Sequence, residues 1–148
     1  MAFRHILVAT DFSEASGPAL RLAVEMAREG GSDLTVHHTC EVPFYAYTEL
    51  AMSPVDLLEP VVEVARRKLV DLVAGLHDRC PGAHAVLKVG VPWEQILAAA
   101  REAGADLLVV GTHGRHGVTH ALLGSVAEKV VRLSPVPVLT VRAPPAPG

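Results

Sequence analysis

Short runs of apolar residues alternate with longer segments in which apolar positions recur at helical spacing. The short runs are nearly continuous and rich in Val, Leu and Ile. This pattern is typical of parallel strands that are buried on both faces. It predicts strands at residues 5–10, 34–39, 83–89, 105–110 and 136–141.

The longer segments each carry one apolar face at the spacing of an α-helix. They predict helices at about residues 16–30, 54–77, 92–103 and 124–133. Ser13 or Ser16 can cap the first helix, and its apolar face consists of Leu20, Ala23, Val24 and Ala27. Glycine residues end the first and third helices, at Gly30, Gly31 and Gly104.

The second helix contains a proline within its apolar pattern. Ser53-Pro54-Val55-Asp56 resembles a capping box with proline at the first helical position. Pro60 then leaves two alternatives, a helix that starts near Glu59 or one that bends at Pro60. The irregular segment before it, residues 40–52, is predicted to be a long loop.

Alternating strands and helices predict an α/β protein with a doubly wound parallel sheet and right-handed crossovers. At 148 residues the chain is expected to form one domain, residues 1–142. Residues 143–148 are predicted to be a disordered Pro-rich tail. Ligands of such sheets bind at the carboxyl ends of strands, where the strand order reverses.

Composition narrows the class of protein. Half of the residues are hydrophobic and 20% are charged, which indicates a folded chain. The net charge of −3 argues against nucleic acid or an anionic membrane as a partner. The sequence shows neither an apolar run of about 18 residues nor an apolar leader, so a cytoplasmic protein is expected. Cys40 and Cys80 are expected to be free thiols.

A glycine-rich loop follows the fourth strand and precedes a helix. It reads Gly111-Thr112-His113-Gly114-Arg115-His116-Gly117, and Gly124-Ser125 open the helix. Glycines let backbone N–H groups approach an anion, and a helix N-terminus supplies unpaired donors, so a phosphate-bearing ligand is predicted. The alternative is that the glycines only form a turn. The loop lacks the Gly-Lys-Ser/Thr of a P-loop, and the first strand–helix turn lacks the glycines of a dinucleotide site.

Several motifs together resemble the universal stress protein family. The glycine pattern Gly111-x-x-Gly114, nine residues, then Gly124-Ser125 is similar to that family's nucleotide-binding motif. The opening run His5-Ile6-Leu7-Val8-Ala9-Thr10-Asp11-Phe12-Ser13 is similar to its first strand and aspartate. Gly90-x-Pro92-x-x-x-Ile96 and the closing run from Pro135 to Arg142 also match. The resemblance covers residues 4–142.

The resemblance implies a Rossmann-like fold of the adenine nucleotide alpha hydrolase type, with strand order 3-2-1-4-5 and four helices. It implies that Ala9 and Thr10 line the base pocket, that Asp11 contacts the ribose, and that the Thr39 backbone reads the adenine edge. Val110 and Gly111 would lie beside the base and the ribose. The residues that bind the phosphates would be His113, Gly114, Gly124, Ser125 and Val126.

Arg115 is the remaining candidate of the site. It could neutralise phosphate charge, and its alternative is a solvated loop arginine. The expected ligand is ATP, or AMP or ADP, with Mg or Mn held only through the phosphates.

Histidines raise the question of a protein-ligated metal, which is not expected. His113, His116 and His120 are spaced three and four residues apart, but they lie in a loop where that spacing guarantees nothing. His37 and His38 alternate across a strand, so both cannot face one ion.

We identify no catalytic motif in the sequence, and no catalytic residue is assigned. The predicted function is an ATP-binding regulatory module of the universal stress type, with little or no turnover. Two alternatives remain: a slow ATPase or adenylate-transferring enzyme of the same superfold, and an interaction module without nucleotide.

The last strand, 136–141, is predicted to lie at a sheet edge. Its apolar, β-branched residues would leave an open edge prone to association. The resemblance implies a homodimer through this strand. The alternative is that the tail or a loop covers the edge.

Overall fold

A computed structural model describes residues 2–42, 54–113 and 123–143. A five-stranded parallel sheet has the order β3-β2-β1-β4-β5, as predicted. In chain order the elements are β1 (His5–Ala9), a short 3₁₀ turn (Glu14–Ser16), α1 (Gly17–Gly30), β2 (Asp33–Cys40), α2 (Pro54–Ala74), β3 (Ala83–Val89), α3 (Pro92–Ala103), β4 (Leu107–Gly111), α4 (Ser125–Leu133) and β5 (Val138–Val141).

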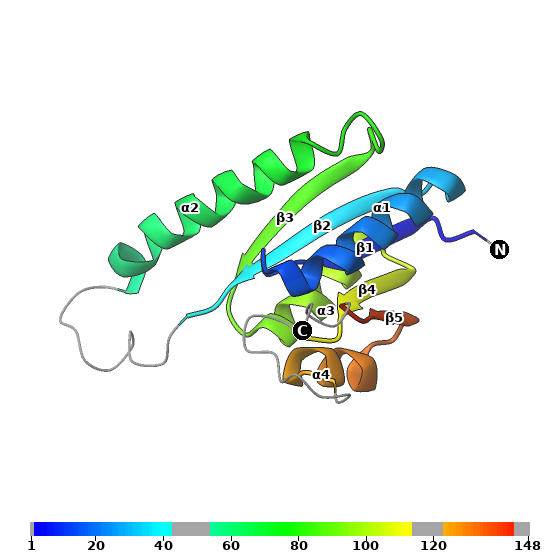
Figure 1. Ribbon diagram of the computed structural model, residues 1–148. Coiled ribbons are helices and arrows are strands. Elements are labelled where there is room, and N and C mark those ends of the chain that lie inside the picture. The colour runs from blue at the N-terminus through cyan, green and yellow to red at the C-terminus, as the bar shows by residue number, and fades with distance from the viewer. Residues whose placement is uncertain (1, 43–53, 114–122, 144–148) are drawn as a thin grey trace, which may run out of the picture.

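Helices cover both faces of the sheet (Figure 1). Successive side chains of a strand point to opposite faces. Ile6 and Val8 of β1 therefore pack into one apolar cluster with α1 and α2. Leu7, between them, packs into a second cluster with α3 and α4. Two cores of this kind explain why the strand sequences are apolar without alternation.

The first helix begins differently from the prediction. The Ser13 hydroxyl accepts a hydrogen bond from the Ser16 N–H at 3.2 Å and so caps the 3₁₀ turn, while Ser16 makes no side-chain cap to α1. Pro18 lies in the first turn of α1, where its missing N–H costs nothing. Both predicted glycine ends are confirmed, since Gly31 and Gly104 have φ of 66° and 68°.

The second helix is continuous from Pro54, with Pro60 inside it. A start near Glu59 was therefore wrong. The helix ends at Ala74, before the predicted His77, and turns continue to Arg79. The predicted cap, Ser53, lies outside the described residues, as do most of the predicted loop and of the tail.

Strand boundaries shift by one to two residues for local reasons. β2 includes Cys40, whose carbonyl accepts the Gly90 N–H at 3.0 Å. β4 begins after Asp106, whose carboxylate accepts the N–H groups of Arg4 and His5 at 2.9 Å each. These bonds lower the pKa of Asp106. β5 begins after Pro137, which has no N–H to donate.

Cys40 and Cys80 are both buried, and neither forms a disulfide. No helix in the described part of the chain has the length and apolarity needed to cross a bilayer.

Candidate functional site

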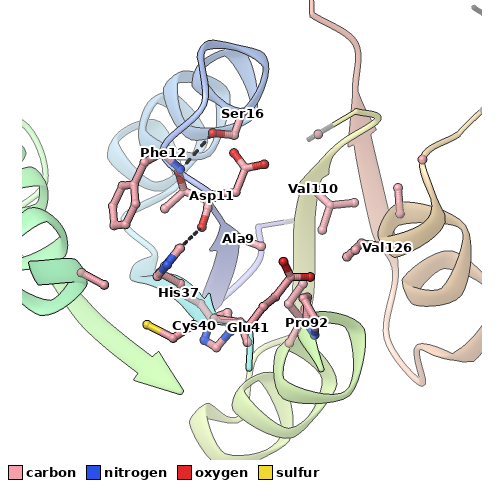
Figure 2. A pocket seen from close by; sticks show the side chains of 18 of the residues that line it. Ala9, Asp11, Phe12, Ser16, His37, Cys40, Glu41, Pro92, Val110 and Val126 are labelled. Atoms are coloured by element: carbon pink, nitrogen blue, oxygen red, sulfur yellow. Dashed lines mark hydrogen bonds between the residues drawn. The ribbon is translucent and has the colours of Figure 1, made fainter. Parts of the chain in front are cut away.

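A cavity of about 720 Å³ opens at the carboxyl ends of β1, β2 and β4. This is the point where the sheet order reverses between β1 and β4, the usual ligand site of such sheets. Figure 2 shows Ala9 and Asp11 on one side of the opening and Val110 and Val126 on the other. Every described residue of the predicted site lines it, namely Ala9, Thr10, Asp11, Thr39, Val110, Gly111, His113, Gly124, Ser125 and Val126.

The turn after β1 holds Asp11 in place. Its carboxylate accepts the Ser13 N–H at 2.9 Å and also the Ser13 hydroxyl. The Thr10 hydroxyl is buried, pairs with the Ser16 hydroxyl at 3.1 Å and accepts the Phe12 N–H at 3.1 Å. Thr10 therefore shapes the turn, and the half-buried Asp11 is presented to the cavity.

β2 extends past the end of β1. The His37 carbonyl accepts the Thr10 N–H at 2.8 Å on the β1 side, whereas the Cys40 carbonyl bonds toward β3. Because peptide groups alternate along a strand, the N–H and C=O of Thr39 point to the β1 side. β1 pairs with β2 only as far as Ala9 and His37, so no strand in the described part of the chain faces the Thr39 peptide group there. A donor and an acceptor are thus available together at the cavity.

The two histidines of β2 point to opposite sides, as predicted. His37 Nε2 lies 2.7 Å from the Thr39 hydroxyl, and its Nδ1 is buried without a hydrogen-bond partner. His38 Nδ1 donates to the Thr10 carbonyl at 2.8 Å. Burial, followed by the charges of His38 and Lys88, lowers the pKa of His37 to about 4. His37 is therefore neutral at pH 7.

The start of α4 lies beside the end of β4. The Gly124 N–H donates to the Thr112 carbonyl at 2.6 Å, so this N–H is already used. The first helical bond of α4 is donated by Glu128, which leaves the N–H groups of Ser125, Val126 and Ala127 without intrahelical acceptors. These three N–H groups are the donors at the start of the helix that lie at the cavity. Gly124 serves by close approach, since a Cβ there would lie 3.0 Å from the Thr112 carbonyl oxygen.

Only some of the residues predicted to bind phosphate lie within the described ranges. His113 is half-buried, and its Nδ1 lies 3.1 Å from the Thr112 hydroxyl. Gly114, Arg115, His116 and His120 lie outside the described residues. Over the described ranges, no three His, Cys, Asp or Glu side chains are arranged to hold a metal.

The cavity also contains residues that the sequence pattern did not single out. Glu41 and Thr112 directly follow β2 and β4, so their position after a strand end was the available signal. Phe12 lines the cavity because its backbone is left-handed, with φ of 65°, which no local pattern indicated. Residues of α2 line it as well, and only the tertiary structure brings them there.

Comparison with known proteins agrees with this geometry. The sequence profile of the universal stress protein family matches residues 2–142. The universal stress protein YxiE of Bacillus subtilis is 31% identical over 147 residues, which cover 95% of this chain and 99% of that protein. The chain thus matches this relative over nearly its whole length.

Solved structures show the same fold. The structure of protein MJ0577 superposes with a TM-score of 0.84 at 27% identity and covers 97% of this chain and 99% of that one. Two others, each 25% identical, were solved with a nucleotide: a universal stress protein with cAMP (TM-score 0.69, covering 97% of this chain and 100% of that one) and one from Archaeoglobus fulgidus with dAMP (TM-score 0.66, covering 96% and 100%). The chain belongs to the universal stress protein family.

Proposed function

We propose that the protein binds ATP, or AMP or ADP, and acts as a nucleotide-dependent regulatory module with little or no turnover. The observation that carries this proposal is the convergence on one cavity of Asp11, Thr39 and the N-terminus of α4. The cavity volume falls within the range of small-molecule sites.

Each part of the cavity suits one part of a nucleotide. The Thr39 N–H and C=O offer a donor and an acceptor to the edge of adenine. The Asp11 carboxylate suits ribose hydroxyls, which are donors. The N–H groups of Ser125, Val126 and Ala127 suit phosphate oxygens, helped by the helix dipole. Mg or Mn would be held through the phosphates.

The cAMP and dAMP complexes of related proteins support an adenine nucleotide as the ligand class. A mass spectrum of small molecules released from the purified, denatured protein tests the proposal. We expect an adenine nucleotide at close to one per chain. Protein that carries none, and that binds none by calorimetry, would favour a nucleotide-free interaction module. Steady phosphate release that is lost in Asp11→Asn would favour the enzyme alternative.

The base pocket predicts a preference for ATP over GTP. Adenine and guanine exchange donor and acceptor at the edge that the Thr39 peptide group would read. The wrong base leaves a polar group unpaired, at a cost of about 1–3 kcal/mol. Calorimetric titration with both nucleotides measures the difference, and equal affinities would show that Thr39 does not read the base.

We also propose a cytoplasmic homodimer that pairs through β5, with no nucleic acid or membrane partner. β5 lies at the sheet edge. The Pro137 carbonyl accepts the N–H of Leu108 in β4, and the Val141 carbonyl accepts the N–H of Thr112, directly after β4. The intervening Val138 and Thr140 peptide groups therefore point outward. The outward groups are the ones that a second copy would pair with.

Thr140→Pro should therefore give a monomer. The substitution removes an outward N–H and leaves the bonds to β4 intact. Thr140→Val keeps that N–H and should remain dimeric, which makes it the matched control. Light scattering at tens of micromolar measures both. A monomeric wild type, or a dimeric Thr140→Pro variant, would place any interface elsewhere.

A further inference from the structure

The apolar stripe of α2 is covered by the sheet along only part of its length. Leu69 and Val73 are buried in the core beneath the sheet. Val61 and Val64 lie beside this stripe, nearer the helix start, and are 56% and 57% exposed. Figure 1 shows this first part of α2 extending beyond the end of the sheet.

Residues in this first part of α2 form one wall of the cavity. Pro60, Val61, Val64, Ala65 and Lys68 line it from α2, at positions that share one helical face. The opposite wall consists of Phe12, His38 and Cys40. We call this part of the cavity, defined by these residues, the α2 lobe. Its lining is apolar except for His38 and Lys68.

Phe12 separates the α2 lobe from the candidate nucleotide site. Its left-handed backbone, unusual for a bulky residue, turns its ring away from the adjacent Asp11 and toward α2 (Figure 2). The ring packs on His38 with a centroid distance of 4.3 Å, and Lys68 Nζ lies 5.9 Å from its centroid. The same turn thus presents a carboxylate to one part of the cavity and an aromatic wall to the other.

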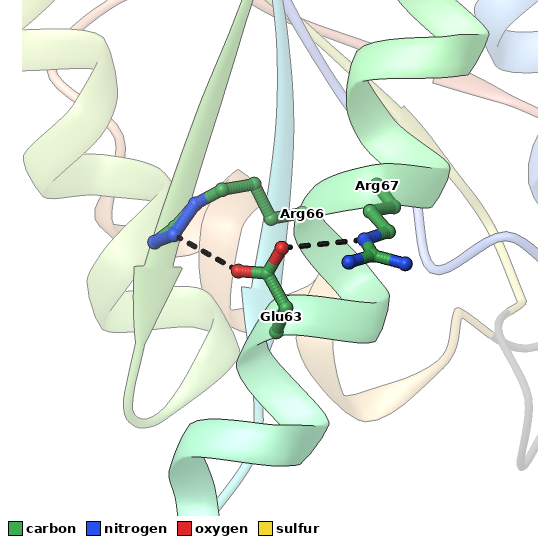
Figure 3. A network of polar contacts seen from close by, with 3 residues as sticks. All are labelled: Glu63, Arg66 and Arg67. Atoms are coloured by element: carbon green, nitrogen blue, oxygen red, sulfur yellow. Dashed lines mark hydrogen bonds and ion pairs between the residues drawn. The ribbon is translucent and has the colours of Figure 1, made fainter.

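Lys68 carries the charge on this face of α2. On a neighbouring face, Glu63 pairs with Arg67 at 3.3 Å and lies 3.9 Å from Arg66 (Figure 3). Among the residues that the structure describes, no carboxylate forms an ion pair with Lys68. Within the described ranges, the Lys68 ammonium group therefore has no counter-charge and lies at the end of an apolar surface.

We propose that the α2 lobe binds a small amphiphilic carboxylate, with an alkyl chain along Pro60, Val61 and Val64 and the carboxylate at Lys68. The rise from Pro60 to Lys68 is about 12 Å along the helix, which suits a medium-length chain such as decanoate. The chain gains by burying apolar surface, and Lys68 supplies the counter-charge. This site stands independently of the proposed nucleotide function.

Calorimetric titration of the full chain with decanoate tests the site without nucleotide. We expect saturable binding below about 0.1 mM. Val64→Glu places a carboxylate in the α2 lobe and should weaken decanoate binding by at least about tenfold. Val70→Glu is the matched control, because Val70 is also exposed on α2 but does not line the cavity, and it should change binding less than about twofold.

Lys68→Met tests the charge while keeping the stem apolar. It should weaken decanoate binding by about three- to fivefold and leave the binding of uncharged decanol unchanged. Absence of saturable decanoate binding to the wild type would overturn the proposal and favour residues 43–53 or a second copy as the occupant. Equal weakening by Val64→Glu and Val70→Glu would also overturn it, because binding would then not involve the α2 lobe.

Discussion

Ser125→Glu is expected to weaken ATP binding by about a thousandfold, because it places a like charge where a phosphate would lie. Ser125 is the exposed first residue of α4, and its N–H has no intrahelical acceptor. A glutamate there competes for the helix N-terminus and repels the phosphates. It should not harm the fold, since acidic residues are favourable in the first turn of a helix.

The matched control for this variant is Val131→Glu, which adds the same charge at an exposed position of the same helix. Calorimetry should show ATP affinity close to that of the wild type. Unchanged affinity in Ser125→Glu would refute the phosphate site at α4. Gly124→Glu is a less clean test, because its Cβ would lie 3.0 Å from the Thr112 carbonyl oxygen and would strain the loop.

The free energy of unfolding should fall by about 2.5 kcal/mol between pH 7.5 and pH 4.5, because of His37. Burial lowers the pKa of this side chain to about 4, whereas an unfolded histidine titrates near its ordinary value of 6.5. Within that window the unfolded chain binds the proton and the folded chain does not. Stability is therefore present above pH 6.5 and is lost as the pH falls.

Urea denaturation at the two pH values measures the loss. His37→Val should flatten the pH dependence whatever its effect on stability at pH 7.5, and His77→Val, at an exposed site, is the control. Burial also lowers the pKa of His5, which adds in the same direction. The lowered pKa of Asp106 acts only below about pH 4, outside the window. A wild type equally stable at both pH values would contradict the assignment.

Local chemistry made much of the fold predictable. Gly31 and Gly104 end helices because the residue after each helix adopts left-handed backbone there, which glycine does without steric cost, and glycine after an apolar helical run is visible in the sequence. The strands stood out because burial on both faces demands continuous apolar runs. The boundaries of the strands were harder to predict, because hydrogen bonds from distant residues decide them, as at Asp106 and Cys40.

The candidate site was predictable to the same degree. The glycines and Ser125 stood out because an anion site needs these residue types at a helix start, and Asp11 stood out because it is a carboxylate at the end of the first strand. Glu128 donates the first helical hydrogen bond of α4, so the N–H groups of Ser125, Val126 and Ala127 have no intrahelical acceptor. The Gly124 N–H is not available in this way, because it donates to the Thr112 carbonyl. Whether the Gly124 N–H is bonded depends on where Thr112 lies in the folded chain, and the sequence motif does not indicate that position.

The sequence by itself determined the element types, the two-faced sheet and, through its motifs, the family resemblance, because these depend on local propensity and periodicity. Only the tertiary structure decided what α2 faces. Leu69 lies on the apolar face that the sequence predicts and is buried, whereas Val61 and Val64 lie beside that face, beyond the end of the sheet, and line the cavity. Whether an apolar stripe is buried depends on where another element stops, and that is a property of the packed chain alone.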